Sequence, residues 1–180
     1  MMSVRTPTIL NLPALVSSIL LCLFSSPAQS EVSETHHGSW TVRCETTAPE
    51  QAPSCIMFQN LVLKTGGQTV LQFAVGMTPD NGQATVLLSL PLGISLPPGV
   101  MIQIDDGKIA QFPVERCEPD GCRAGMKLRE TTVNQLRDGS NLEITFFDGE
   151  RHPIRMPLSL TGFGAAFAAL QEVLGNAQSR

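Results

Sequence analysis

The sequence predicts an all-β fold, an antiparallel β-sandwich with a short C-terminal helix. The first observation is a recurrent turn signal, because Asn-Gly and Asp-Gly dipeptides accept the positive φ that tight hairpin turns require. The second is that short runs around these dipeptides alternate apolar and polar residues, as half-buried strands do. Many short strands separated by turns are typical of sandwiches and barrels. The dipeptides are Asn81-Gly82, Asp106-Gly107, Asp120-Gly121, Asp138-Gly139 and Asp148-Gly149.

Six runs have strand character. In chain order they are residues 69–75, 84–90, 100–104, 108–114, 122–128 and 141–147.

Helix is expected in two places. Residues 131–136 should form one or two turns that end at Asp138-Gly139. A stronger helical pattern covers residues 162–174, with Thr161 or Ser159 as the N-cap and Gly175 as the stop signal. We expect its apolar stripe to pack over one end of the sheet, and binding of a partner is the alternative. The stripe comprises Phe163, Ala166, Phe167, Leu170, Val173 and Leu174.

Residues 1–30 have the pattern of a secretory signal peptide. Arg5 precedes an apolar stretch over residues 9–24, and small residues suited to signal peptidase follow, ending at Ser30. The stretch is shorter than the ~20 residues of a membrane-spanning helix. We therefore predict cleavage near Ser30. A transmembrane anchor and a lipoprotein modified at Cys22 are the alternatives.

Composition narrows the function classes for the remaining chain. Residues 31–180 are predicted to form one domain, long enough to bury a core. Removing residues 1–30 takes away one basic residue, Arg5, and shifts the formal net charge from −4 to −5. An acidic exported domain without a basic run is a poor candidate for nucleic-acid binding. No second long apolar segment follows the signal, so a membrane span after cleavage is not expected, and any partner should be a protein.

Four cysteines follow the signal, and the compartment predicts that they form structural disulfides. They are Cys44, Cys55, Cys117 and Cys122. Glu118-Pro119-Asp120-Gly121 has the residues of a type I turn, which would bring Cys117 and Cys122 together. Two local pairs, Cys44–Cys55 and Cys117–Cys122, are favoured, and a bridge between the regions such as Cys44–Cys117 stays open. Neither spacing is that of a redox Cys-x-x-Cys motif or of a four-cysteine zinc site.

The sequence contains no pattern typical of a catalytic triad or of another known catalytic group. His36 and His37 lie in a polar segment after the signal, where chain ends are usually mobile. His152 falls in a turn, and no serine has the sequence context of a nucleophile elbow. We predict no enzymatic activity, cofactor or metal. The alternative is an exported enzyme or thiol-redox accessory protein that uses His152 or a labile disulfide.

Four ordered motifs resemble invasion-associated locus B proteins. They are a Gly-x-Trp-x-Val-x-Cys start at residues 38–44, the segment 90–100, the stretch from Cys117 to Cys122 and the ending 156–163. The resemblance implies an exported, immunoglobulin-like β-sandwich of Gram-negative bacteria, some of whose relatives are linked to host-cell invasion. It implies no catalytic residues.

The proline-rich segment 91–99 is the candidate partner-binding element. Its prolines and glycines restrict a largely apolar loop, which would lose little entropy on binding. The alternative is a stiff connection packed on the core. We therefore predict a periplasmic or secreted, non-enzymatic interaction protein that contacts a protein of the bacterial envelope or of a host surface. The candidate residues are Pro91, Leu92, Ile94, Leu96, Pro97 and Pro98.

Overall fold

The computed structural model describes residues 31–46, 52–62, 66–78 and 81–178, which form two antiparallel sheets and two helices. The predicted signal peptide lies outside these residues. The large sheet contains, in spatial order, β1 (Glu31–His37), β2 (Trp40–Thr46), β3 (Ser54–Val62), β4 (Thr69–Met77), β5 (Ala84–Leu90), β9 (Gly121–Lys127) and β8 (Val114–Glu118). The small sheet contains β11 (Pro153–Ser159), β10 (Asn141–Phe147), β6 (Val100–Ile104) and β7 (Ala110–Phe112). The helices are α1 (Glu130–Asp138) and α2 (Phe163–Gln178).

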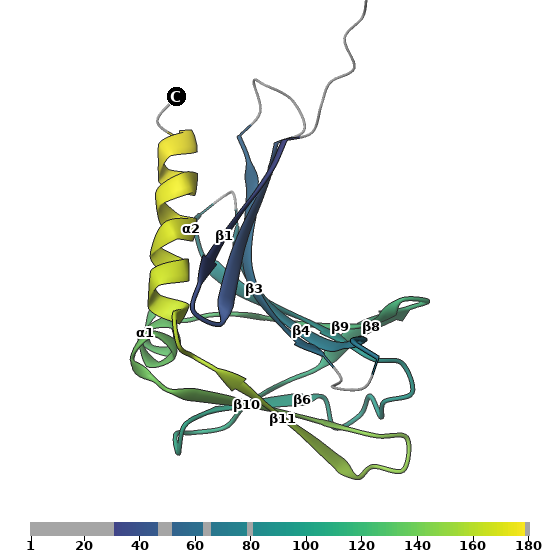
Figure 1. The fold of residues 1–180 in the computed structure, drawn as a ribbon. Helices are drawn as coiled ribbons and strands as arrows, with labels where there is room; N and C mark the ends of the chain where they lie inside the picture. The colour runs from purple at the N-terminus through teal and green to yellow at the C-terminus, as the bar shows by residue number, and fades with distance from the viewer. Residues whose placement is uncertain (1–30, 47–51, 63–65, 79–80, 179–180) are drawn as a thin grey trace, which may run out of the picture.

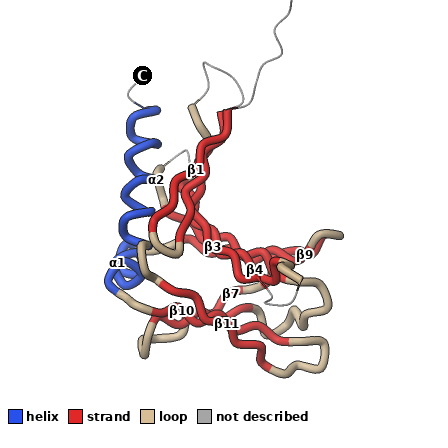
Figure 2. The backbone as a smooth tube through the Cα atoms, viewed as in Figure 1, coloured by secondary structure: helices blue, strands red, loops and turns tan. Residues whose placement is uncertain are grey.

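The two sheets pack face to face over half of the large sheet, and α2 covers the rest. Figure 1 shows the small sheet below β3, β4 and β9, while α2 runs beside β1, β2 and β3. Figure 2 shows the two helices together at one end and the long loops at the opposite end. The predicted all-β sandwich with a C-terminal helix is confirmed. In the described part of the chain, neither helix is long and apolar enough to cross a membrane.

Trp40 is at the centre of the core where the large sheet meets α2. Its side chain is fully buried, and its ring makes edge-to-face contacts with Phe73 and Phe163 at centroid distances of 5.7 and 5.0 Å. Its indole N–H donates to the carbonyl of Ser159 at 3.1 Å, so the one polar atom of the ring is satisfied. Gln59 is also buried, and its amide nitrogen donates to the same carbonyl.

The first hairpin and the start of α2 are locked together by two glycines. The amide of Ser39 donates to the carbonyl of Thr161 at 3.0 Å. Gly38 and Gly162 have φ values of 60° and 90°, and each lies against the backbone of the other segment. A Cβ on Gly162 would overlap the carbonyl oxygen of His37. The motif at residues 38–44 and the motif at residues 156–163 are therefore in direct backbone contact.

Five of the six predicted runs each correspond to one strand, whereas β1, β2, β3 and β11 lie outside the predicted runs. Residues 84–90, 100–104 and 141–147 are strands with the predicted bounds. The single strand predicted over residues 108–114 is wrong, since the chain leaves the small sheet after Phe112 and enters the large sheet at Val114. Pro113, which lacks an N–H to continue the ladder, lies at this crossover.

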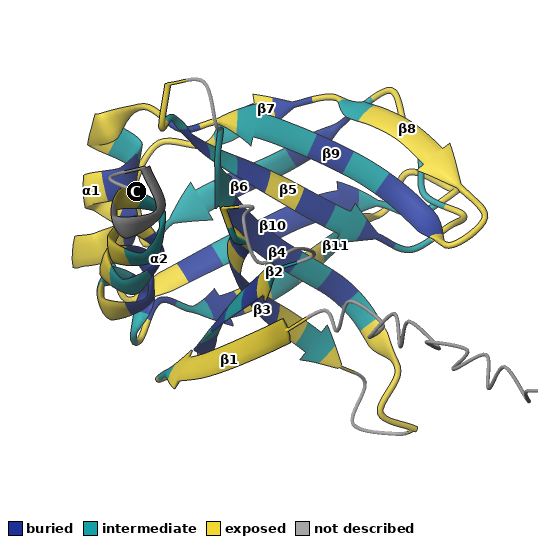
Figure 3. Ribbon diagram, turned by 90° about the horizontal axis from the view of Figure 1, so that it is seen from above, coloured by how far each residue is buried: buried dark blue, intermediate teal, exposed yellow. Residues whose placement is uncertain are grey.

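The prediction of a mobile segment at His36 and His37 is wrong. Both belong to β1, each of whose residues is paired with one of β2. Figure 3 shows β1 exposed along nearly its whole length, so the strand has no apolar pattern that periodicity could detect. Its order comes from backbone hydrogen bonds and from the hairpin turn at Gly38.

The helices follow the predicted pattern with one difference. α1 ends at Asp138 as expected, but α2 continues past Gly175 to Gln178. A side chain at Gly175 would meet no atom within 4 Å, so no tertiary contact enforces a stop there. The apolar stripe of α2 packs on β2 and β3, as predicted, and its buried members are Phe163, Ala166, Phe167 and Leu170.

Candidate interaction surface

The loop of residues 91–99 connects β5 of the large sheet to β6 of the small sheet. Leu92 and Leu96 are 54% and 46% exposed, and Pro97 is exposed as well. Ile94 is half-buried and packs against the core. Ile94 therefore anchors the loop on the core, as the alternative of a packed connection expects, whereas Leu92 and Leu96 face solvent.

The 91–99 loop is fixed at its middle and at its last residue by backbone contacts. The amide of Ser95 donates to the carbonyl of Phe147 at 2.9 Å, next to a bridge between Ile94 and Asp148. At Gly99 the loop approaches β7 so closely that a Cβ there would overlap the carbonyl oxygen of Phe112. Gly99 also has φ 66°, which favours glycine.

The turn between β10 and β11 contains Asp148, which forms the bridge with Ile94 of the loop. The Asp148 carboxylate accepts backbone N–H bonds from Glu150 at 2.9 Å and His152 at 2.8 Å. The bond from His152 N–H is the main cause that lowers the pKa of Asp148. Arg151, and not Gly149, takes the positive φ, 70°, in this turn. The Asp-Gly dipeptide therefore acts here through its aspartate side chain.

His152 lies exposed in this turn beside two carboxylates. Its Nδ1 lies 3.3 Å from Asp148 Oδ2 and 3.6 Å from Glu150 Oε2, and its side chain is 70% exposed. Within the described residues, no serine or cysteine hydrogen-bonds to it, and no three His, Cys, Asp or Glu side chains form a possible metal site.

The turn between β8 and β9 lies against the start of the 91–99 loop. A Cβ on Gly121 would be 2.6 Å from the carbonyl oxygen of Leu90, so the two backbones touch. Between this turn, the loop and β4 is an open groove of about 700 Å³, which we call the loop-end groove. It is lined by Asn60, residues 68–72, residues 89–92, Pro119, Asp120 and Arg123. Arg123 and Asp120 form an ion pair within it.

Both disulfides join residues that are directly opposite each other on neighbouring strands. Cys44–Cys55 links β2 to β3 and Cys117–Cys122 links β8 to β9, with Cα–Cα distances of 4.1 and 3.9 Å. These are the two local pairs that the spacing favours. The second bridge closes the hairpin whose turn borders the loop-end groove.

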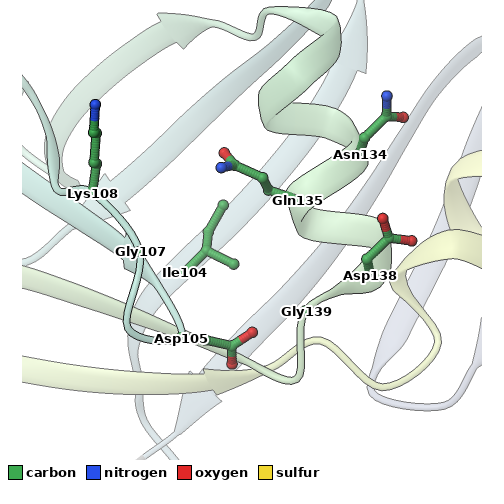
Figure 4. Close-up of a pocket in the computed structure, with 8 residues that line it drawn as sticks. All are labelled: Ile104, Asp105, Gly107, Lys108, Asn134, Gln135, Asp138 and Gly139. Carbon is green, nitrogen blue, oxygen red and sulfur yellow. The ribbon is translucent and has the colours of Figure 1, made fainter.

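A smaller hollow of about 320 Å³ lies at the opposite end, beside α1 (Figure 4). Asp105 at its edge accepts N–H bonds from Ser140 and Asn141, the second at 2.9 Å. That carboxylate therefore ties the end of β6 to the start of β10. Asp105 itself has φ 45°, whereas Gly107 beside it has no positive φ.

Three comparisons identify relatives of this chain. The family model described as Invasion associated locus B (IalB) protein matches residues 40–171. Invasion protein B homologs of Brucella abortus strain 2308 and of biovar 1 strain 9-941 are each 27% identical over 157 residues, 87% of this chain and 89% of theirs. The crystal structure of invasion associated protein b from Bartonella henselae shares the fold, with a TM-score of 0.69 and 23% identity over 82% of this chain and 99% of that one. Since the family model matches well over half of its residues, the chain belongs to the IalB family.

Proposed function

We propose that this protein is an exported, non-enzymatic interaction protein whose loop end contacts a protein of the bacterial envelope or of a host-cell surface. The names of the Brucella and Bartonella relatives support a role associated with invasion. The two disulfides support export, because such bridges persist in oxidising compartments such as the periplasm or the exterior.

The observation that carries the proposal is the pair Leu92 and Leu96, apolar side chains held in solvent by a fixed loop. Each is about half exposed, while Ile94 between them is anchored. A loop that is already ordered loses little conformational entropy when a partner binds. Leu92 also lines the loop-end groove, so an exposed apolar side chain lies there beside the polar groups that the rim of an interaction site usually contains.

The size of the effect can be estimated. Complete burial of a leucine side chain contributes about 1.5–3 kcal/mol, so covering the exposed half of each contributes about 1 kcal/mol. Replacing both by aspartate should weaken binding by at least ~2 kcal/mol, which is roughly 30-fold in Kd.

Site-specific photo-crosslinking tests the proposal. A photoreactive amino acid is placed at Leu96 or, as a matched control, at Ile109, which is 57% exposed in the β6–β7 turn. The exported protein is irradiated in the producing cells and on host cells. We expect a discrete protein adduct from the probe at position 96. Adding unlabelled wild-type protein as a competitor should abolish this adduct, whereas adding the Leu92→Asp/Leu96→Asp protein should not. Equal adducts from both positions, or none from Leu96, would contradict the proposal.

A further inference from the structure

The two disulfides differ in their access to solvent. Cys44 and Cys55 are 8% and 6% exposed and belong to the core cluster beneath α2. Cys122 is 1% exposed, but its partner Cys117 lies exposed on β8, a strand at the edge of the large sheet. One cysteine of the second bridge is therefore an exposed residue at the edge of the sheet, while the other is enclosed.

We propose that Cys117–Cys122 is a site of thiol–disulfide exchange, and that its opening loosens the loop-end groove. The chemical partner is a thiol, either a small thiol or the dithiol of a reductase. The exchange is inferred from the exposure of Cys117 on a strand at the edge of the sheet. The consequence for partner binding rests on the function proposed above.

The reaction has a defined direction. The incoming thiolate attacks Sγ of Cys117, a new S–S bond forms there, and the Cys117–Cys122 bond breaks. The electron pair leaves with Sγ of Cys122, which takes a proton from water or stays a thiolate. A second thiol then releases Cys117, so two thiols are oxidised to one disulfide as this bridge is reduced. Cys122 can reverse the first step, because it stays beside Cys117 in the hairpin.

The bridge closes a turn that is also held by the ion pair between Asp120 and Arg123. Glu118 pairs with Gly121 at the end of the β8–β9 ladder, immediately beyond the disulfide. The Arg116–Glu118 ion pair on β8 is about half exposed at both side chains and contributes little. Gly121 touches the carbonyl of Leu90, the residue before Pro91. Opening the bridge therefore removes the covalent restraint on the turn that forms one wall of the loop-end groove, and leaves the end of the ladder and the Asp120–Arg123 ion pair to hold it.

The Cys44–Cys55 bridge is the other disulfide that a thiol could reduce. A pocket of about 460 Å³ between α2 and the β4–β5 turn reaches Cys55. Both cysteines of that bridge nevertheless remain nearly enclosed, and the sheet continues on both sides of β2 and β3. Exchange at Cys44–Cys55 should thus require a larger opening of the fold and be much slower.

Graded reduction tests the exchange site in the intact exported protein. Samples are treated with increasing dithiothreitol, alkylated and mapped by mass spectrometry. We expect Cys117 and Cys122 to be labelled at least ~10-fold faster than Cys44 and Cys55, with a populated species that retains Cys44–Cys55. Simultaneous labelling of all four, or earlier labelling of Cys44 and Cys55, overturns the proposal. So does global unfolding of the singly reduced species.

Hydrogen exchange tests the coupling to the groove. Peptides over residues 88–98 are compared in the oxidised wild type, in the singly reduced and alkylated protein, and in Cys117→Ser/Cys122→Ser. Gly121→Ala provides a matched variant that displaces the turn from Leu90 with the bridge intact. We expect faster exchange in residues 88–98 in all three altered forms, and unchanged exchange in β10. Unchanged protection of residues 88–98 in the opened forms overturns the coupling. Neither result depends on a partner, so failure of the proposed function would be seen separately.

Discussion

Replacing Gly162 by alanine should weaken the junction between the first hairpin and α2. Gly162 has φ 90°, a conformation that costs an L-residue roughly 1–2 kcal/mol. The new Cβ would also lie 2.6 Å from the carbonyl carbon of His37, about 1 Å inside ordinary contact, and overpacking of this kind costs about 1–3 kcal/mol. The sum is a loss of about 2–5 kcal/mol, a large share of the ~5–15 kcal/mol that stabilises a domain.

Urea denaturation followed by tryptophan fluorescence measures this loss. The chain contains one tryptophan, Trp40, which is fully buried beside the junction and reports its integrity. Gly164→Ala is the matched control, because its Cβ would meet only a side-chain atom of Arg137 at 3.9 Å. We expect Gly164→Ala to unfold at or slightly above the wild-type midpoint and Gly162→Ala well below it. Equal midpoints for Gly162→Ala and the wild type would refute the reasoning.

Three further predictions concern the bridges and the β10–β11 turn. Removing Cys44–Cys55 should lower the free energy of unfolding by about 3 kcal/mol and removing Cys117–Cys122 by about 2 kcal/mol, because the first bridge closes the longer loop. Equilibrium unfolding of the two double cysteine-to-serine variants measures both losses. Asp148→Asn should destabilise the protein at neutral pH, because a carboxylate with a lowered pKa contributes stability above its unfolded-state pKa. The deficit should close as the pH falls below about 4, and a deficit that is constant with pH would count against the hydrogen bonds to Asp148. His152→Ala should leave partner crosslinking at Leu96 unchanged, whereas loss of crosslinking with the fold intact would favour a histidine-dependent activity.

Periodicity and turn chemistry predicted β4, β5, β6, β9 and β10 because core residues recur along these strands. The run 84–90 is an example, since its apolar positions are buried at Ala84, Val86, Leu88 and Leu90. β1 escaped prediction because its side chains face solvent and its stability comes from backbone pairing. The crossover at Pro113 escaped because local alternation continues across two strands that belong to different sheets.

The candidate surface could be predicted only in part. The composition of residues 91–99 indicated a stiff apolar loop, but not which side chains face solvent. The contact of Gly121 with Leu90 and the bond from Ser95 to Phe147 join segments distant in sequence, so no local pattern encodes them. The cysteine spacing likewise favoured the local pairs but could not show that Cys117 is exposed and Cys44 buried, because that depends on the position of each strand in the sheet.

The affinity of the crosslinked partner for matched variants tests the central claim most directly. Once an adduct at Leu96 identifies the partner, its Kd is measured for the wild type, for Leu92→Asp/Leu96→Asp and for Ile109→Asp. If Leu92 and Leu96 contact the partner, the affinity should fall roughly 30-fold for the double variant and less than threefold for Ile109→Asp, with all three proteins equally stable. Equal affinity of the wild type and the double variant would contradict the assignment of binding to this surface.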